Sequence, residues 1–258
     1  MDKNSQIVCL VVNCFNSEKY LKDTLQSLID QTYKNTRILC INNKSTDNTA
    51  KIISDFAKTD ERIISFDLEV HMSLVEARNF AVSHISEMEN VMFFGFCDSD
   101  DLWNKDWVTS LIDISQNADI VFCNGFYLYQ ETGSLVKVDN CLSKRTRDTF
   151  SSPLHIQSAL FSKRLIRNDK FFDERLKIIY DIDYFINLKK LNVRYVHISD
   201  NLFTYRIHGQ SLSSTKLWRI FVERLLITRK HKLSLLLFIL KYFFIIFGVY
   251  KIRNKLSR

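Results

Sequence analysis

The chain has 258 residues, of which 46% are hydrophobic and 25% charged, proportions typical of a globular protein with a sizeable core. Its five glycines lie too far apart for a G-x-G-x-x-G dinucleotide turn or a G-x-x-x-x-G-K-S/T phosphate loop, so both of these nucleotide sites are excluded. The net charge of +7 is unevenly distributed, because residues 216–258 contain 11 Lys or Arg and one acid, whereas residues 1–215 contain 25 basic and 28 acidic residues.

The first half of the chain alternates short apolar runs with helical patterns. The apolar runs predict strands at residues 7–12, 37–43, 63–66, 91–97 and 120–123. The helical patterns predict helices at residues 17–31, from 45–47 onward, at 73–88 and at 106–116. Ser17 is the expected N-cap of the first helix, and Ser73 with Glu76 has the spacing of a capping box. This repeated order predicts an α/β fold with a parallel sheet covered by helices.

The second half is less regular. Residues 126–150 have the pattern of a hairpin or loop, and residues 155–166 that of either a strand or a helix. A helix is expected from about Asp181 to Lys190, followed by a strand near Leu202–Arg206. From residue 216 onward the sequence becomes helical and basic.

An acidic loop follows the predicted strand 91–97 directly. It contains three carboxylates in four residues, Asp98, Asp100 and Asp101, at the carboxyl end of a strand, where parallel α/β sheets bind ligands. The three negative charges repel one another and favour an oxygen-preferring divalent cation such as Mg²⁺ or Mn²⁺. The alternative is a solvated acidic loop that caps the next helix.

A series of sequence motifs, in the same order along the chain, resembles those of family 2 glycosyltransferases. Residues 11–49 are similar to the opening of that family, with an N-x-x-x-Y-L helix, Q-T-Y and an S-T-D-N-T turn. The later matches are E-A-R-N at 76–79, C-D-S-D-D-L-W at 97–103, F-D-E-R-L at 172–176, D-I-D at 181–183 and Y-R-I-H-G-Q-S at 205–211. The resemblance covers about residues 5–214 and implies a GT-A fold, with a mixed, mainly parallel sheet flanked by helices. It also implies transfer of a sugar from a nucleotide-sugar with inversion, and a place in bacterial surface-polysaccharide or lipopolysaccharide synthesis.

The resemblance assigns the acidic residues. Asp100 would ligate Mn²⁺ or Mg²⁺, Asp98 would hold the ribose or the metal shell, and Asp101 would shape the loop. His208 would lie near the metal or the diphosphate. Asp181 matches the general base of the family's E-D motif, although Tyr180 replaces the Glu of that motif.

The resemblance also assigns the donor site. Asn13 and Asn43 match the residues that contact the nucleobase, with an amide at position 43 where the family has an acid. A UDP-sugar is the expected donor. Arg78 and Arg206 match residues near the diphosphate. The alternative for Arg78 is a solvated charge on a helix.

Residues 1–215 form the expected glycosyltransferase domain, with nucleotide-sugar binding in about 1–125 and the acceptor side in about 126–215. His155 and Gln157 resemble an acceptor-side stretch. Trp103 is expected either in the core or as an acceptor platform. The acceptor would be a hydroxyl of a glycan or of a lipid-linked glycan.

Residues 216–258 form the expected tail, a basic, hydrophobic and helical segment. Its run Leu233–Tyr250 is barely long enough to span a bilayer, and Lys241 near the middle disfavours spanning, so we expect a helix that lies on an anionic membrane surface. A transmembrane anchor and packing on the protein or in a homodimer are the alternatives. Nucleic acid is not an expected partner, because the basic residues interrupt an apolar run.

The cellular compartment follows from two further patterns. None of the six cysteines forms a C-x-x-C pair, and the N-terminal apolar run is too short for a secretory signal. We therefore expect an enzyme on the cytoplasmic face of the cell membrane. A degenerate protein that only binds nucleotide-sugars is the alternative function, because positions 43 and 180 depart from the family pattern.

Overall fold

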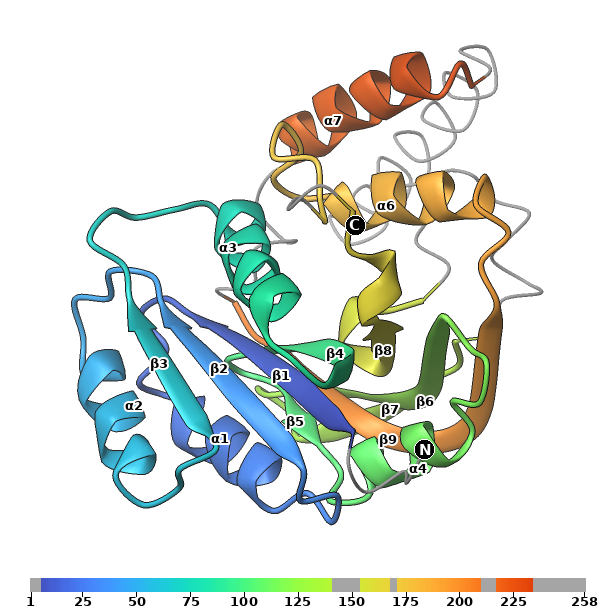
Figure 1. Ribbon diagram of the computed structural model, residues 1–258. Coiled ribbons are helices and arrows are strands. Elements are labelled where there is room, and N and C mark those ends of the chain that lie inside the picture. Colours follow the sequence, from blue (N-terminus) through green and yellow to red (C-terminus); the bar gives the residue numbers. More distant parts are fainter. Residues whose placement is uncertain (1–5, 141–153, 168–170, 210–216, 234–258) are drawn as a thin grey trace.

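A nine-stranded mixed sheet organises the computed structural model, which describes residues 6–140, 154–167, 171–209 and 217–233 (Figure 1). The strands are β1 Ile7–Cys14, β2 Thr36–Asn42, β3 Ile63–Asp67, β4 Val91–Asp98, β5 Leu102–Trp103, β6 Ile120–Tyr129, β7 Ser134–Val138, β8 Ala159–Ser162 and β9 Tyr195–Ile207. The helices are α1 Leu21–Ile29, α2 Thr49–Ala57, α3 Leu74–Glu87, α4 Trp107–Asp113, α6 Tyr180–Lys189 and α7 Leu217–Lys230. The prediction of a mixed α/β sheet flanked by helices is confirmed.

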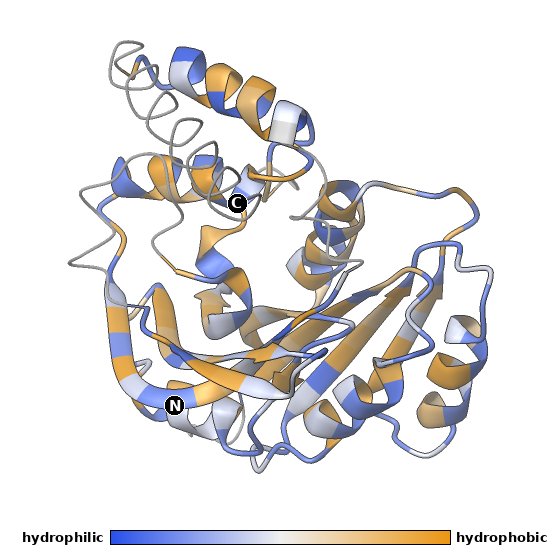
Figure 2. Ribbon diagram, turned by 180° about the vertical axis from the view of Figure 1, so that it is seen from behind, coloured by the Kyte–Doolittle hydropathy of each residue, from blue (hydrophilic) through white to orange (hydrophobic). Residues whose placement is uncertain are grey.

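The N-terminal part of the sheet is entirely parallel, in the order β3-β2-β1-β4. Strands β1 and β4 are almost wholly buried because both faces of the sheet are covered, whereas the edge strand β3 has exposed residues (Figures 1 and 2). Cys9 and Val11 of β1 pack in the cluster that contains α3, whereas Val8, Leu10 and Val12 pack in the cluster that contains α1, α2 and α4. The period-2 alternation of a strand therefore divides one apolar run between two cores.

The second part of the sheet continues beyond β4 with antiparallel pairs. Strand β8 pairs with β4 on one side and β6 on the other, and β9 runs parallel to β6 and antiparallel to β5. Strand β9 continues past the predicted end, to Ile207. Its approach to β6 requires glycine at 125, because a Cβ there would lie 2.4 Å from the Phe203 carbonyl oxygen. The end of β9 reaches the acidic loop, where the Arg206 backbone N–H donates to Asp101 Oδ1.

Two predicted helix starts have different outcomes. Ser73 and Glu76 form a complete capping box at the start of α3, as predicted. Ser17 does not cap α1, so that prediction was wrong. The helix begins at Leu21, and the Ser17 hydroxyl instead pairs with the Ser99 hydroxyl at 2.7 Å. A serine four residues before the helix is thus used to hold the acidic loop.

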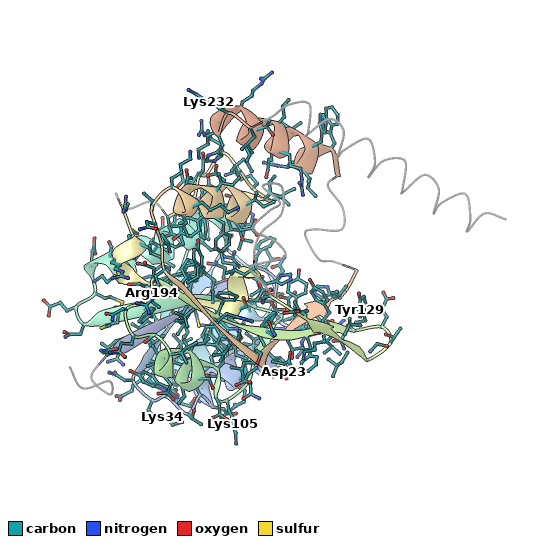
Figure 3. The ribbon with its side chains drawn as sticks, turned by 90° about the vertical axis from the view of Figure 1, so that its right-hand side faces the viewer. Asp23, Lys34, Lys105, Tyr129, Arg194 and Lys232 are labelled. Atoms are coloured by element: carbon teal, nitrogen blue, oxygen red, sulfur yellow. The ribbon has the colours of Figure 1, made fainter. Side chains whose placement is uncertain are left out.

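Helices α6 and α7 lie one above the other on the α3 side of the sheet (Figure 1). Lys232, just beyond α7, lies at the opposite end of the molecule from Lys34 and Lys105 (Figure 3). Ile227 of α7 is 2% exposed and belongs to the same core cluster as α6. The first helix of the predicted tail therefore packs against the body of the protein.

Most of the predicted membrane segment, from residue 234 onward, lies outside the described residues. Among the residues that the structure does describe, no helix combines the length and apolarity needed to cross a bilayer.

Candidate active site

The acidic loop lies at the carboxyl edge of the parallel strands. Asp98 is the last residue of β4 and is in register with Asn13 of β1, so the two predicted donor-site residues are on adjacent strands. Asn13 Oδ1 is buried and has no hydrogen-bond partner among the described residues. This edge therefore offers a carboxylate and an unused buried acceptor side by side.

Arg78 connects the acidic loop to α6. It is 1% exposed, and its guanidinium donates one hydrogen bond to Asp98 Oδ1 and another to the Tyr180 hydroxyl. Burial acts to lower the pKa of this guanidinium, but the oxygens of Tyr180, Asp98 and Asp181 raise it overall. The alternative of a solvated helix charge is wrong for Arg78, because its side chain is a buried cation between two elements.

Asp181 is the second residue of α6 and is half-buried. Ile179 occupies the N-cap position, so Asp181 lies inside the first turn of α6 and does not cap the helix. Its sequence neighbour Tyr180 accepts a hydrogen bond from the Arg78 guanidinium, and the Asp181 carboxylate is one of the groups that raise the pKa of Arg78. The structure thus brings the predicted general base and the predicted diphosphate-side residues, Arg78 and Asp98, to one region.

Asp100 and His208 form a second pair in the loop. Asp100 Oδ2 and His208 Nε2 are 2.7 Å apart. Burial, followed by the negative charge of Asp98, raises the pKa of Asp100, while the His208 contact opposes that rise. A cation beside Asp98 and Asp100 would remove this repulsion.

Asp101 shapes the loop from within the protein, as predicted. It is fully buried, and its Oδ1 accepts from the Arg206 backbone N–H at 2.9 Å while its Oδ2 accepts from Gln157 Nε2 at 3.3 Å. Burial and the neighbouring acids raise its pKa well above the usual range. The Arg206 guanidinium turns away, toward Asp23 Oδ2 at 3.0 Å and over the ring of Tyr20 at 4.9 Å.

The three predicted acceptor-side residues divide into two groups. Trp103 and Gln157 are each 3% exposed, and the Trp103 indole N–H donates to the Gln157 carbonyl oxygen at 2.9 Å. Trp103 also stacks on Trp107 at 3.7 Å, which favours the core alternative. Both residues are therefore buried beside the acidic loop. His155, in contrast, is half-buried and is hydrogen-bonded to the Tyr127 hydroxyl at 2.7 Å.

Asn43 lies at the end of β2 with its side chain already bonded. Its Oδ1 accepts from the Met72 N–H at 2.8 Å, and its Nδ2 donates to the Met72 carbonyl at 2.7 Å. These two hydrogen bonds connect the segment before α3 to the end of β2. Beside it, the exposed rings of Phe15 and His71 lie 4.4 Å apart.

A divalent metal fits the chemistry of this loop. Within the part of the chain that the structure describes, no three His, Cys, Asp or Glu side chains are grouped to hold an ion. Mg²⁺ and Mn²⁺ sites at phosphates do not need three, because one or two carboxylates and the substrate's own oxygens complete the shell. Asp98 and Asp100 supply that carboxylate pair, and His208 a nearby nitrogen donor.

Sequence reasoning missed several residues that hold the loop. Thr24 of α1 donates its hydroxyl to the Ser99 and Asp101 carbonyl oxygens, at 3.0 and 2.9 Å. Its helical spacing from Leu21 and Leu28 places it on the buried face, and a threonine there needs a polar partner. That spacing was the available signal for Thr24, but the partner, 75 to 77 residues away, has no sequence pattern.

Comparisons with known proteins agree on the family. The sequence model of Glycosyl transferase family 2 matches residues 9–173, more than half of the chain. The minor teichoic acid biosynthesis protein GgaA of Bacillus subtilis is 24% identical over 209 residues, which cover 76% of this chain and 46% of GgaA.

Two solved structures share the fold. One is Staphylococcus aureus TarS 1–349 in complex with UDP-GlcNAc, with a TM-score of 0.71 and 20% identity; the match covers 86% of this chain and 66% of that one. The other is the mannosyltransferase PcManGT of Pyrobaculum calidifontis in complex with GDP-Man and Mn²⁺, with a TM-score of 0.63 and 14% identity; the match covers 84% of this chain and 64% of that one. The chain spans only part of each of these proteins. We conclude that it belongs to glycosyl transferase family 2, with a mixed α/β, GT-A-like fold, and is a glycosyltransferase.

Proposed function

We propose that the protein transfers a sugar from a nucleotide-sugar to an acceptor hydroxyl with inversion at the anomeric carbon. The observation that carries this proposal is Arg78, a buried cation bonded at once to Asp98 on the donor side and to Tyr180, next to Asp181, at the start of α6. The two hydrogen bonds of Arg78 thus link the proposed diphosphate site to the start of the helix that carries the proposed base.

Asp181 is the proposed general base. As the acceptor oxygen bonds to the anomeric carbon, the bond from that carbon to the diphosphate oxygen breaks and an Asp181 carboxylate oxygen takes the hydroxyl proton. A positioned base of this kind contributes about 10²–10⁴-fold to the rate. Tyr180, which replaces the acidic residue of the family motif, would orient Arg78 instead of carrying charge, since burial raises the pKa of its hydroxyl far above neutrality.

Asp98 and Asp100 would hold Mn²⁺ or Mg²⁺, with His208 beside Asp100. When bound, the ion supplies positive charge to the leaving nucleoside diphosphate. Arg78, by bonding one oxygen of Asp98, would fix the orientation of that carboxylate.

UDP is the proposed nucleotide. The unpartnered Oδ1 of Asn13 could accept a hydrogen bond from the N3–H of uracil. TarS, a fold neighbour, has been solved with UDP-GlcNAc, and GgaA is named for teichoic acid biosynthesis, so we propose a bacterial surface polysaccharide, or its lipid-linked precursor, as the acceptor.

The proposed location is the cytoplasmic face of the membrane. Trp218, Val222 and Leu226 are exposed by 75%, 37% and 44%, and their spacing of four places them on one outer face of α7. Together with the basic residues of 216–258, this face suits an anionic lipid surface. A second copy of the chain is the alternative partner for the same face.

The test combines donor binding with turnover. Thermal-shift measurements with UDP-, GDP- and dTDP-sugars, with and without Mn²⁺, should give a metal-dependent stabilisation by a UDP-sugar. Asp181→Asn should keep that shift and lose transfer. A variant that transfers sugar as well as the parent protein does would remove Asp181 from its role, and a parent protein that binds without any turnover would favour the degenerate alternative.

A further inference from the structure

Glu223 is the single acidic residue of 216–258, and it is buried at the junction of α7 and α6. It is 2% exposed, and its carboxylate accepts three consecutive backbone N–H groups. The distances are 2.9 Å from Lys177 to Oε1, 2.9 Å from Ile178 to Oε2 and 3.1 Å from Ile179 to Oε2. A buried carboxylate with this many charge-assisted bonds is fixed in place.

The three amides lead directly into the helix that carries Asp181. Ile179 occupies the N-cap position of α6 and has no side-chain cap bond of its own. The amides at the start of a helix have no partner inside it and carry partial positive charge. Of the three amides, that of Ile179 belongs to the N-cap and those of Lys177 and Ile178 precede it, so Glu223, 44 to 46 residues away, holds the turn that leads into α6.

The same turn is attached to the helix that carries Arg78. Lys177 Nζ donates to the Ser73 hydroxyl at 2.8 Å and lies 3.0 Å from Glu76 Oε1. Ser73 and Glu76 are the capping box of α3. Glu223 therefore holds a turn that contacts both functional helices, the one with Asp181 and the one with Arg78.

A separate contact holds the other end of α7. Lys230 Nζ lies 2.8 Å from both Asp183 Oδ2 and Asp173 Oδ2, and His231 Nε2 lies 2.7 Å from Asp183 Oδ1. These contacts dock α7 but do not touch the turn 177–179. They provide a matched control, because their loss weakens docking without removing the acceptor from that turn.

We propose that Glu223 is a positioning residue for Asp181, and that α7 is a working part of the catalytic unit. This inference rests on the proposed function, in which Asp181 is the base. Glu223 does not touch the substrate in this scheme. It holds the turn that leads into α6, and thereby sets the distance between Asp181 and the site built on Arg78 and Asp98.

The experiment compares Glu223→Gln with Lys230→Met in the full chain, using the UDP-sugar found by thermal shift. Glutamine has the same size but replaces one acceptor oxygen with an NH₂ group that cannot accept. We expect kcat of Glu223→Gln to fall about 10- to 100-fold, as for a small misplacement of a reacting group, with donor KM within about twofold. Lys230→Met should lower stability similarly and keep kcat within about threefold of the parent value.

Hydrogen exchange gives a readout that does not depend on activity. Amides 177–179 should exchange faster in Glu223→Gln and remain protected in Lys230→Met. Unchanged kcat in Glu223→Gln, or an equal loss in both variants, would overturn the inference. If Glu223→Gln does not fold, Glu223→Asp, which retains the charge on a shorter side chain, is judged by the same criteria.

Asp181→Asn separates the two levels of the argument. If it retains transfer, the proposed function fails for Asp181. If it is inactive while Glu223→Gln turns over normally, only the positioning inference fails.

Discussion

Arg78→Met provides the sharpest test of the site, because Arg78 lies between the two halves of the proposed chemistry. Methionine fills most of the arginine's volume but removes the cation and both donors. Breaking one partner of a buried ion pair costs about 3–5 kcal/mol. Asp98 is 31% exposed and can be hydrated once released, so we expect the low end, about 3 kcal/mol.

The assays measure stability and donor binding separately. For a chain of this size, about 3 kcal/mol corresponds to a fall in Tm of about 6–12 °C. Donor affinity and kcat should both fall, because Asp98 loses its orientation and Tyr180 loses its partner. We expect kcat/KM to drop at least about 100-fold, the scale for loss of a preorganised charge.

Arg78→Lys is the matched control. It keeps the charge, but a single ammonium group does not reproduce the planar guanidinium that bonds Asp98 and Tyr180 at once. It should recover part of the stability and less of kcat. If Arg78→Met left Tm and donor affinity unchanged, Arg78 would not connect the donor site to α6, and the central argument for the proposed function would be refuted.

Three further predictions follow from individual contacts. Asp100→Asn removes a half-buried charge that Asp98 repels, so Tm measured by calorimetry should stay the same or rise, while transfer falls at least about 100-fold; a large loss of stability would contradict this. Gln157→Leu leaves Asp101 Oδ2 without its donor, so urea unfolding should show a loss of about 1–3 kcal/mol, and no loss would mean that this bond is unimportant. Hydrogen bonds from Ser73, then from Lys177, lower the pKa of Glu76 from 4.5 to about 2, so its carboxylate stabilises the fold above pH 4.5 and that contribution is lost as the pH falls toward 2. Glu76→Gln should therefore be less stable than the parent at pH 7, and the difference should shrink at pH 3; a difference that is constant with pH would count against the contact.

The sequence predicted those features that depend on near neighbours. The capping box of α3 depends only on residues three apart, and the continuous apolar run of β1 indicates by itself a strand buried on both faces. Both predictions were correct. The four strands β1 to β4 likewise follow from local runs and the β-α order. The acidic loop was found because its carboxylates are adjacent in the sequence.

Features that depend on distant contacts were missed or left open. Strand β8 inserts antiparallel between β4 and β6, and its short sequence had been equally consistent with a helix. Serine is a residue type favoured at N-caps, but the Ser17 hydroxyl is hydrogen-bonded to the hydroxyl of Ser99, 82 residues away. Glu223 looked like an isolated acid in a basic tail, because its three amide partners lie 44 to 46 residues earlier and carry no side-chain signature.

The contacts of α7 also predict where the chain can be shortened. A chain that ends at residue 215 loses Glu223, Lys230 and Ile227, which leaves three amides without an acceptor and Asp183 buried without its cationic partner. Loss of one partner from a buried charge pair alone costs about 3–5 kcal/mol, so this truncation should be unstable or inactive. A chain that ends after residue 233 keeps every one of these contacts and should retain its Tm and its transfer to a soluble acceptor.

Sedimentation with anionic vesicles then distinguishes the two roles of the basic segment. If residues 234–258 carry the proposed membrane attachment, the chain that ends at 233 should bind vesicles much more weakly while turning over normally. Undiminished binding would move the attachment to the exposed face of α7, formed by Trp218, Val222 and Leu226. Normal turnover by the chain that ends at 215 would show instead that α6 holds its position without Glu223, because that truncation removes the carboxylate together with its helix.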